Sequence, residues 1–92
     1  MNGDVYEGEI KGGKRHGKGK YLYENGDEYL GEWKNDVKEG EGRISMISGD
    51  IYEGEWLNGM KNGEGEYCFG NGDHYVGSFY QGMRHGKGYY KW

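Results

Sequence analysis

Three histidines and a single cysteine are the side chains of this sequence best suited to metal binding or nucleophilic chemistry. They are His16, Cys68, His74 and His85. His16 and His85 hold equivalent places in the first and last of four repeats, about 29 Å apart at about 4.8 Å per strand. They cannot share a metal ion or a substrate, and His74 is expected in the opposite set of strand connections. No serine, histidine and acid follow a known catalytic pattern. The sequence therefore predicts no catalytic, metal or cofactor site and no enzyme.

A row of glutamates recurs at Glu9, Glu32 and Glu55. A step of two strands would separate neighbouring carboxylates by about 9.6 Å, close to the spacing in inverting glycosidases. A regular row of solvated glutamates is nevertheless typical of an ordinary surface, so we predict no catalytic role for it.

Three polar segments with glycine resemble ligand-binding loops only in composition. Residues 17–20 read Gly-Lys-Gly-Lys, without the spacing or the following helix of a phosphate-binding loop. Residues 25–28 and 71–73 combine asparagine, glycine and aspartate, but they lack the ligand series of a calcium loop. Ring packing and turn formation explain these segments.

Basic residues gather along one long edge of the expected sheet, most densely in the first repeat. The net charge of -4 argues against nucleic-acid binding, which requires a basic face. A basic edge could still touch anionic phospholipids such as phosphoinositides. A peripheral lipid-binding module is therefore an alternative function, and its candidate residues are Lys14, Arg15, Lys18 and Lys20.

The single cysteine favours a reducing compartment. We find no signal-peptide pattern and no apolar run long enough to cross a bilayer. A cytoplasmic location is expected, with attachment to the cytoskeleton or to a membrane surface as further options. Both ends of the sequence coincide with repeat boundaries, as in a segment of a longer array.

The element that must position these residues is a repeat, because the chain copies itself every 23 residues without insertion or deletion. Of the 21 glycines, 16 fall on four positions of this grid. We predict a single domain over residues 1–92. Its repeats are 3–25, 26–48, 49–71 and 72–92.

Each repeat alternates with period two, which predicts two strands. In the first repeat these strands are residues 4–10 and 17–23. A six-residue turn at 11–16 joins them, and a three-residue link at 24–26 leads to the next repeat. Since no segment has a helical period, the predicted fold is all-β: an elongated, twisted, single-layer antiparallel meander of about eight strands.

The register of the strands follows from their side chains. Pairing Ile10 with Gly17 sets Gly8 against Gly19 and Tyr6 against a second tyrosine. A row of glycines then crosses the sheet, where a bare backbone lets neighbouring rings lie flat.

The rings are expected on one face, and a single sheet has no second layer to cover them. The rings would cover one another in part, and a remaining exposed patch would mark a binding surface. We expect an amphipathic helix of a partner protein in this groove, or self-association through the open terminal strands. The candidate groove residues are Tyr6, Tyr21, Tyr29, Trp33, Tyr52, Trp56, Tyr67, Phe69, Tyr75, Phe79 and Tyr90, and Tyr23 and Trp92 extend the same face.

The repeat resembles the MORN repeat (membrane occupation and recognition nexus). Residues 52–56 read Tyr-Glu-Gly-Glu-Trp and residues 62–65 read Asn-Gly-Glu-Gly, and Arg-His-Gly-Lys-Gly occurs at 15–19 and 84–88. The departures are Ile10 in place of tryptophan and the segment 36–39. The resemblance implies a curved single-layer sheet with an aromatic groove. It also implies scaffolding and protein binding, with lipid binding proposed for some members.

Overall fold

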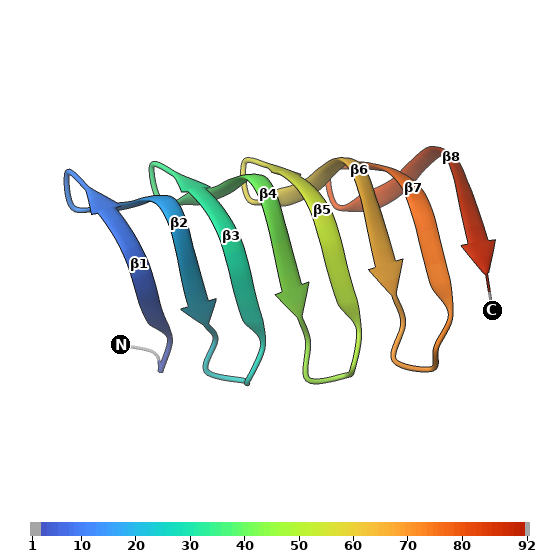
Figure 1. Ribbon diagram of the computed structural model, residues 1–92, viewed down its shortest axis with the longest axis horizontal. Helices are drawn as coiled ribbons and strands as arrows, with labels where there is room; N and C mark the ends of the chain where they lie inside the picture. The colour runs from blue at the N-terminus through green and yellow to red at the C-terminus, as the bar shows by residue number, and fades with distance from the viewer. Residues whose placement is uncertain (1–2, 92) are drawn as a thin grey trace.

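The computed structural model describes residues 3–91, which form one open antiparallel sheet of eight strands (Figure 1). Each strand pairs with its neighbours in sequence, so the order in the sheet is β1 to β8. The strands are β1 Val5–Lys11, β2 Lys14–Leu22, β3 Glu28–Lys34, β4 Val37–Ser45, β5 Ile51–Leu57, β6 Met60–Cys68, β7 His74–Tyr80 and β8 Met83–Lys91. This meander confirms the predicted all-β fold. Over residues 3–91 no helix is long and apolar enough to span a bilayer.

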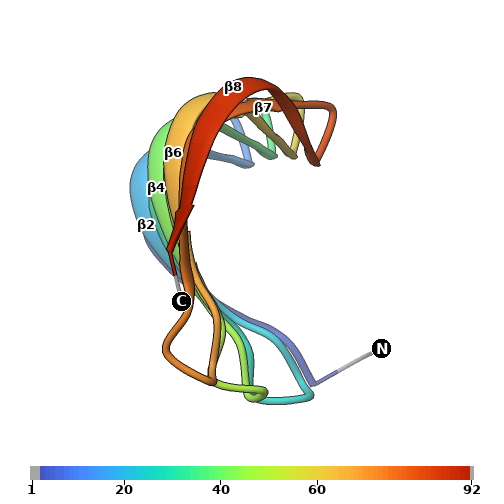
Figure 2. The ribbon, with the colours of Figure 1, turned by 90° about the vertical axis from the view of Figure 1, so that its right-hand side faces the viewer.

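The sheet is elongated, with principal dimensions of 41 × 24 × 18 Å. Seen from its end, the ribbon curls into an arc, so that every strand has a concave and a convex side (Figure 2). Because side chains alternate along a strand, the sheet has a concave face and a convex face.

The connections within each repeat are two-residue turns. The prediction of a six-residue turn at 11–16 is therefore wrong. β1 and β2 continue to a Lys11–Lys14 pair, which leaves only Gly12 and Gly13 between them. Both glycines have positive φ, at 60° and 77°, as tight hairpin turns require. Non-glycine residues also adopt this geometry, since Asn35 has φ 50° and Asp36 has φ 72°.

A β-bulge next to each turn explains why the turn has two residues rather than the predicted six. The predicted pairing of Ile10 with Gly17 is wrong, because Ile10 pairs with Arg15 while Gly8 keeps its predicted partner Gly19. One residue of β1 thus opposes three residues of β2. Gly17 lies in the bulge with φ 76°, a left-handed conformation that favours glycine.

The connections between repeats are the three-residue links predicted from the sequence. Tyr23 donates its backbone N–H to the Asp27 carbonyl at 2.9 Å, which closes the loop of residues 24–26. Gly26 has φ 105° and donates its N–H to the Tyr23 carbonyl. Across the link Tyr21 pairs with Tyr29, Gly19 with Gly31, and Gly17 with Trp33, which continues the predicted row of glycines.

Candidate binding groove

The concave face holds the core of the molecule. Its ring cluster comprises Tyr29, Trp33, Tyr52, Trp56, Tyr75 and Phe79, all buried. The ring at 33, 56 or 79 packs edge-to-face against the tyrosine of its own repeat and that of the preceding one. Trp56 shows both contacts, with its centroid 5.3 Å from Tyr52 and 5.3 Å from Tyr29. Contacts of this kind add about 0.5–1.5 kcal/mol per pair to the burial of area.

Each of these tyrosines crosses the glycine row to reach the bulge. The Tyr52 hydroxyl donates to the Glu55 carbonyl at 2.9 Å, and Tyr29 does the same to Glu32 at 2.9 Å. A methyl group at Gly42 or at Gly65 would overlap the tyrosine hydroxyl beside it. The glycine rows are therefore required by the rings that lie over them.

The tryptophans at positions 33 and 56 each form a hydrogen bond to the preceding repeat. The Trp33 indole N–H donates to the Gly19 carbonyl at 3.2 Å, and that of Trp56 donates to Gly42 at 3.0 Å. Within residues 3–91 no ring or glycine carbonyl precedes Ile10 at this position, and its side chain is 57% exposed.

A second ring row lies toward the three-residue links. The Tyr67 hydroxyl donates to the Asp50 carboxylate at 2.8 Å, and the same carboxylate accepts the Gly70 N–H at 2.7 Å. Burial, and then the bond to Asp50, raise the pKa of Tyr67 to about 12. In the second repeat Ile44 replaces this tyrosine. The predicted groove residues from Tyr6 to Phe79 are in the ring cluster or pack against it. Tyr90 contacts Phe69, with 5.6 Å between the ring centroids, and Trp92 lies outside the described residues.

A row of cations also lies on the concave face, which the sequence did not predict. Its members are Arg15, Lys38, Lys61 and Arg84, which recur every 23 residues. Arg15 lies 4.7 Å from the Trp33 ring centroid, and Lys38 Nζ lies 5.1 Å from that of Trp56. The recurrence was visible in the sequence, but the predicted turn placed these residues outside the strands.

The environment of the cation row leaves most of its charge unpaired. Arg15 is held by Asp36, with 3.0 Å between Nε and Oδ1. Among residues 3–91 this is the only ion pair in the row. Burial, and then the charge of Arg15, lower the pKa of Lys38; burial, and then the charge of Lys38, lower the pKa of Lys61. An anionic group in the groove would offset the repulsion between these neighbouring cations.

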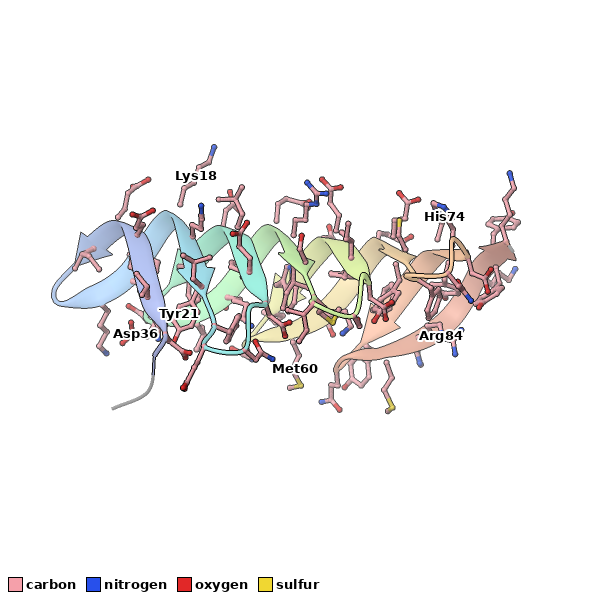
Figure 3. The ribbon with its side chains drawn as sticks, turned by 90° about the horizontal axis from the view of Figure 1, so that it is seen from below. Lys18, Tyr21, Asp36, Met60, His74 and Arg84 are labelled. Atoms are coloured by element: carbon pink, nitrogen blue, oxygen red, sulfur yellow. The ribbon has the colours of Figure 1, made fainter. Side chains whose placement is uncertain are left out.

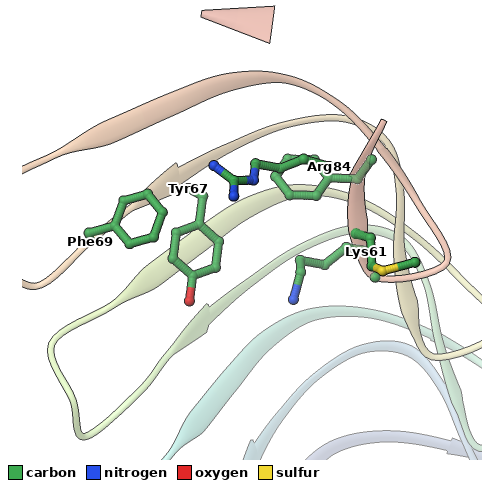
Figure 4. A pocket seen from close by; sticks show the side chains of 7 residues that line it. Lys61, Tyr67, Phe69 and Arg84 are labelled. Carbon is green, nitrogen blue, oxygen red and sulfur yellow. The ribbon is translucent and has the colours of Figure 1, made fainter. Parts of the chain in front are cut away.

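The groove is hollowed at both ends of the cation row. A hollow of about 500 Å³ lies between β6 and β8, where Lys61 and Arg84 face the rings of Tyr67 and Phe69 (Figure 4). A smaller hollow of about 280 Å³ contains Arg15, Asp36 and Lys38. The groove therefore combines apolar walls with cationic side chains.

The four basic candidates for lipid contact do not share a surface. Arg15 lies in the groove over the rings, whereas Lys18 projects from the convex side (Figure 3). Lys20 alternates with the concave Tyr21 and pairs with Glu28 at 3.9 Å. Lys14 lies beside the first two-residue turn.

The glutamate row has a structural task that the sequence did not reveal. The Glu32 carboxylate accepts the backbone N–H of Glu41 at 2.8 Å, and Glu55 accepts that of Glu64 at 2.8 Å. Each bond spans a bulge. The signal was the constant spacing of nine residues between carboxylate and amide, which has meaning only once the bulge is known.

The histidines have separate environments. His16 lies in β2 and His85 in β8, within strands rather than in the turns where the sequence placed them. His74 lies beside Cys68 and Glu66, an arrangement the sequence did not indicate because it depends on strand register.

A family model that describes the MORN repeat matches residues 6–28, 29–51, 52–74 and 75–92. These bounds share the period of the predicted repeats and begin at Tyr6 rather than at Gly3. No curated protein matches the chain.

Proposed function

The chain belongs to the MORN repeat family, and we propose from that premise that it is a non-catalytic interaction module. In this proposal the concave groove holds an amphipathic helix of a partner protein, in the scaffolding manner expected for the family. The single free cysteine, Cys68, supports a cytoplasmic setting. The observation that carries the proposal is the row of cations over the buried rings; within residues 3–91, Arg15 is the one member with a carboxylate partner.

The charge of the groove points to a partner with acidic side chains. The whole chain has a net charge of -4, so the concave cations are a local exception. Lys61 and Arg84 lie in a hollow whose walls are Tyr67, Phe69 and Phe79. A helix with an apolar stripe flanked by carboxylates matches both features.

The spacing of the cations suggests the spacing of those carboxylates. Successive members of the row are two strands apart, or about 9.6 Å. Seven residues of α-helix rise about 10.5 Å. A helix along the long axis would therefore place an acidic residue every seventh position against the row. The 41 Å length of the sheet would accommodate about 27 helical residues.

The test selects helical peptides that bind the chain from a displayed random library. We expect the selected peptides to combine apolar and acidic residues, the acidic ones about seven apart. Joint replacement of Lys61→Glu and Arg84→Glu should weaken binding at least tenfold. The matched control is Lys18→Glu with Lys20→Glu, which makes the same charge change on the convex face and should leave binding unchanged.

The proposed function would be overturned if the selected peptides bound the Lys61→Glu, Arg84→Glu variant as tightly as the unchanged chain. Thermal melting of both double variants checks that each still folds. Tyr52 and Trp56 are unsuitable for this test, because they are buried in the core and their loss would destabilise the sheet as well as alter the groove.

Anionic phospholipid remains the alternative ligand, and the scatter of Lys14, Arg15, Lys18 and Lys20 over different surfaces disfavours it. Vesicles containing phosphoinositide, tested at low salt, decide the matter. Salt-sensitive binding that Lys18→Glu with Lys20→Glu abolishes would favour the lipid function.

A further inference from the structure

Three metal-binding side chains meet on the convex face where the third repeat joins the fourth. Cys68 ends β6 and pairs directly with His74, which begins β7. Glu66 lies two residues before Cys68, and therefore on the same face of β6. Figure 3 shows His74 projecting on the convex side, away from Arg84 in the groove.

The donor atoms are close enough to share one ion. The Nδ1 atom of His74 lies 3.4 Å from the Cys68 sulfur and 3.1 Å from Oε2 of Glu66. All three donor atoms lie within 4.8 Å of one another. Tetrahedral zinc, with bonds of about 2.0 Å to nitrogen or oxygen and about 2.3 Å to sulfur, needs donors about 3.3–3.6 Å apart. Small rotations of the three side chains would reach that geometry.

The repeat itself does not require these residues. One repeat earlier the equivalent positions hold Arg43, Ser45 and Ile51, which form the same strand ends. The first link likewise has Lys20, Leu22 and Glu28. The three ligand types thus occur together at one of three equivalent links, although the backbone is the same at all of them.

We propose that Glu66, Cys68 and His74 bind a divalent transition metal of the zinc class. A set of sulfur, nitrogen and oxygen donors suits zinc, and three protein ligands leave a fourth position open. A hollow of about 450 Å³, whose lining includes Glu66, His74, Tyr89 and the cationic Lys91, adjoins the site and has room for a water molecule or another fourth ligand. Glu53, which pairs with Glu66 across the sheet, adds negative charge nearby.

Cobalt provides a direct probe, because Cys68 is the only cysteine and any thiolate–cobalt absorption band must arise from it. The reduced chain is titrated with Co²⁺, and zinc is then added in competition. We expect one Co²⁺ per chain, a thiolate band that zinc removes, and a higher melting temperature with zinc.

The variants Cys68→Ser and His74→Ile carry the residues that the second link has at these positions, so the fold should survive. Cys68→Ser should abolish the thiolate band, and His74→Ile and Glu66→Gln should each weaken cobalt binding at least tenfold. His85→Ala is the matched control and should bind as the unchanged chain does. The proposal fails if no thiolate band appears, or if His74→Ile binds cobalt as tightly as the unchanged chain.

Discussion

The two faces of this sheet are built from the same strands, yet they have different physical roles. On the concave face Tyr29 and Tyr52 are fully buried. On the convex face Leu30 and Val76 remain about half exposed, at 56% and 47%. A sheet without a second layer can thus form a core on one side, provided that its rings cover one another and that glycine leaves them space. Substitutions on the two faces should therefore have unequal effects.

The largest contrast is expected between Trp56 and Leu30. Trp56→Ala removes a buried ring that contacts two tyrosines and should lower the free energy of unfolding by about 3–5 kcal/mol. Leu30→Ala removes an exposed side chain and should change it by at most about 0.5 kcal/mol. Urea unfolding measures both. Equal losses would show that the concave rings are not the core.

The next contrast concerns glycines. Gly42→Ala forces a methyl group into the Tyr29 hydroxyl and should cost about 1–3 kcal/mol. Gly59→Asp is the control for backbone strain alone, because nothing lies within 4 Å of its missing side chain, and Asp36 has a similar positive φ, 72° against 81°, in the second repeat. If thermal unfolding shows that Gly42→Ala is as stable as the unchanged chain, the rings do not need the glycine row.

One convex residue should break the general contrast. Glu55→Ala removes the carboxylate that accepts the Glu64 N–H across the bulge, and we expect a loss of about 1 kcal/mol. In the fourth repeat Ser78 holds the equivalent position and bonds Glu64 instead, at 2.6 Å. Ser78→Ala should therefore cost less than Glu55→Ala in urea unfolding. The reverse order would contradict the role of the carboxylate in the bulge.

The ionisation of the buried tyrosines has the smallest effect on stability, because it acts only at alkaline pH. Burial, together with the nearby Glu55, raises the pKa of Tyr52 from 10.0 to about 12. Between these values the unfolded chain has lost a proton that the folded chain retains, so stability present below pH 10 declines toward pH 12. The urea midpoint should fall over this range, with tyrosinate absorbance rising as the chain unfolds. A midpoint independent of pH up to 12 would contradict the burial of Tyr52.

The sequence was sufficient to predict the repeat, the ring face and most of the register. Those features follow from the alternation of side chains with period two, and from the pairing of glycine with glycine and tyrosine with tyrosine on neighbouring strands. The bulge at Gly17 could not be predicted, because it adds two residues without disturbing the 23-residue period. Its consequence is large, since it extends the hairpin and moves Arg15 from a predicted turn into the groove.

The convex cluster was missed for a related reason. Cys68 and His74 are six residues apart in sequence, with a link between them, and only the strand register sets their side chains together. Cross-strand proximity of this kind depends on the pairing of β6 with β7, which composition does not contain.

In the proposed function the concave face is both the core of the sheet and the surface that binds the partner. The most direct test follows NMR signals while a selected acidic helical peptide is added to the chain. We predict shifts of the Trp33 and Trp56 indole N–H signals and of the Lys61 side chain, while the Leu30 and Val76 methyl signals stay in place. Shifts confined to Leu30 and Val76 would show that the partner binds the convex face and would contradict the account.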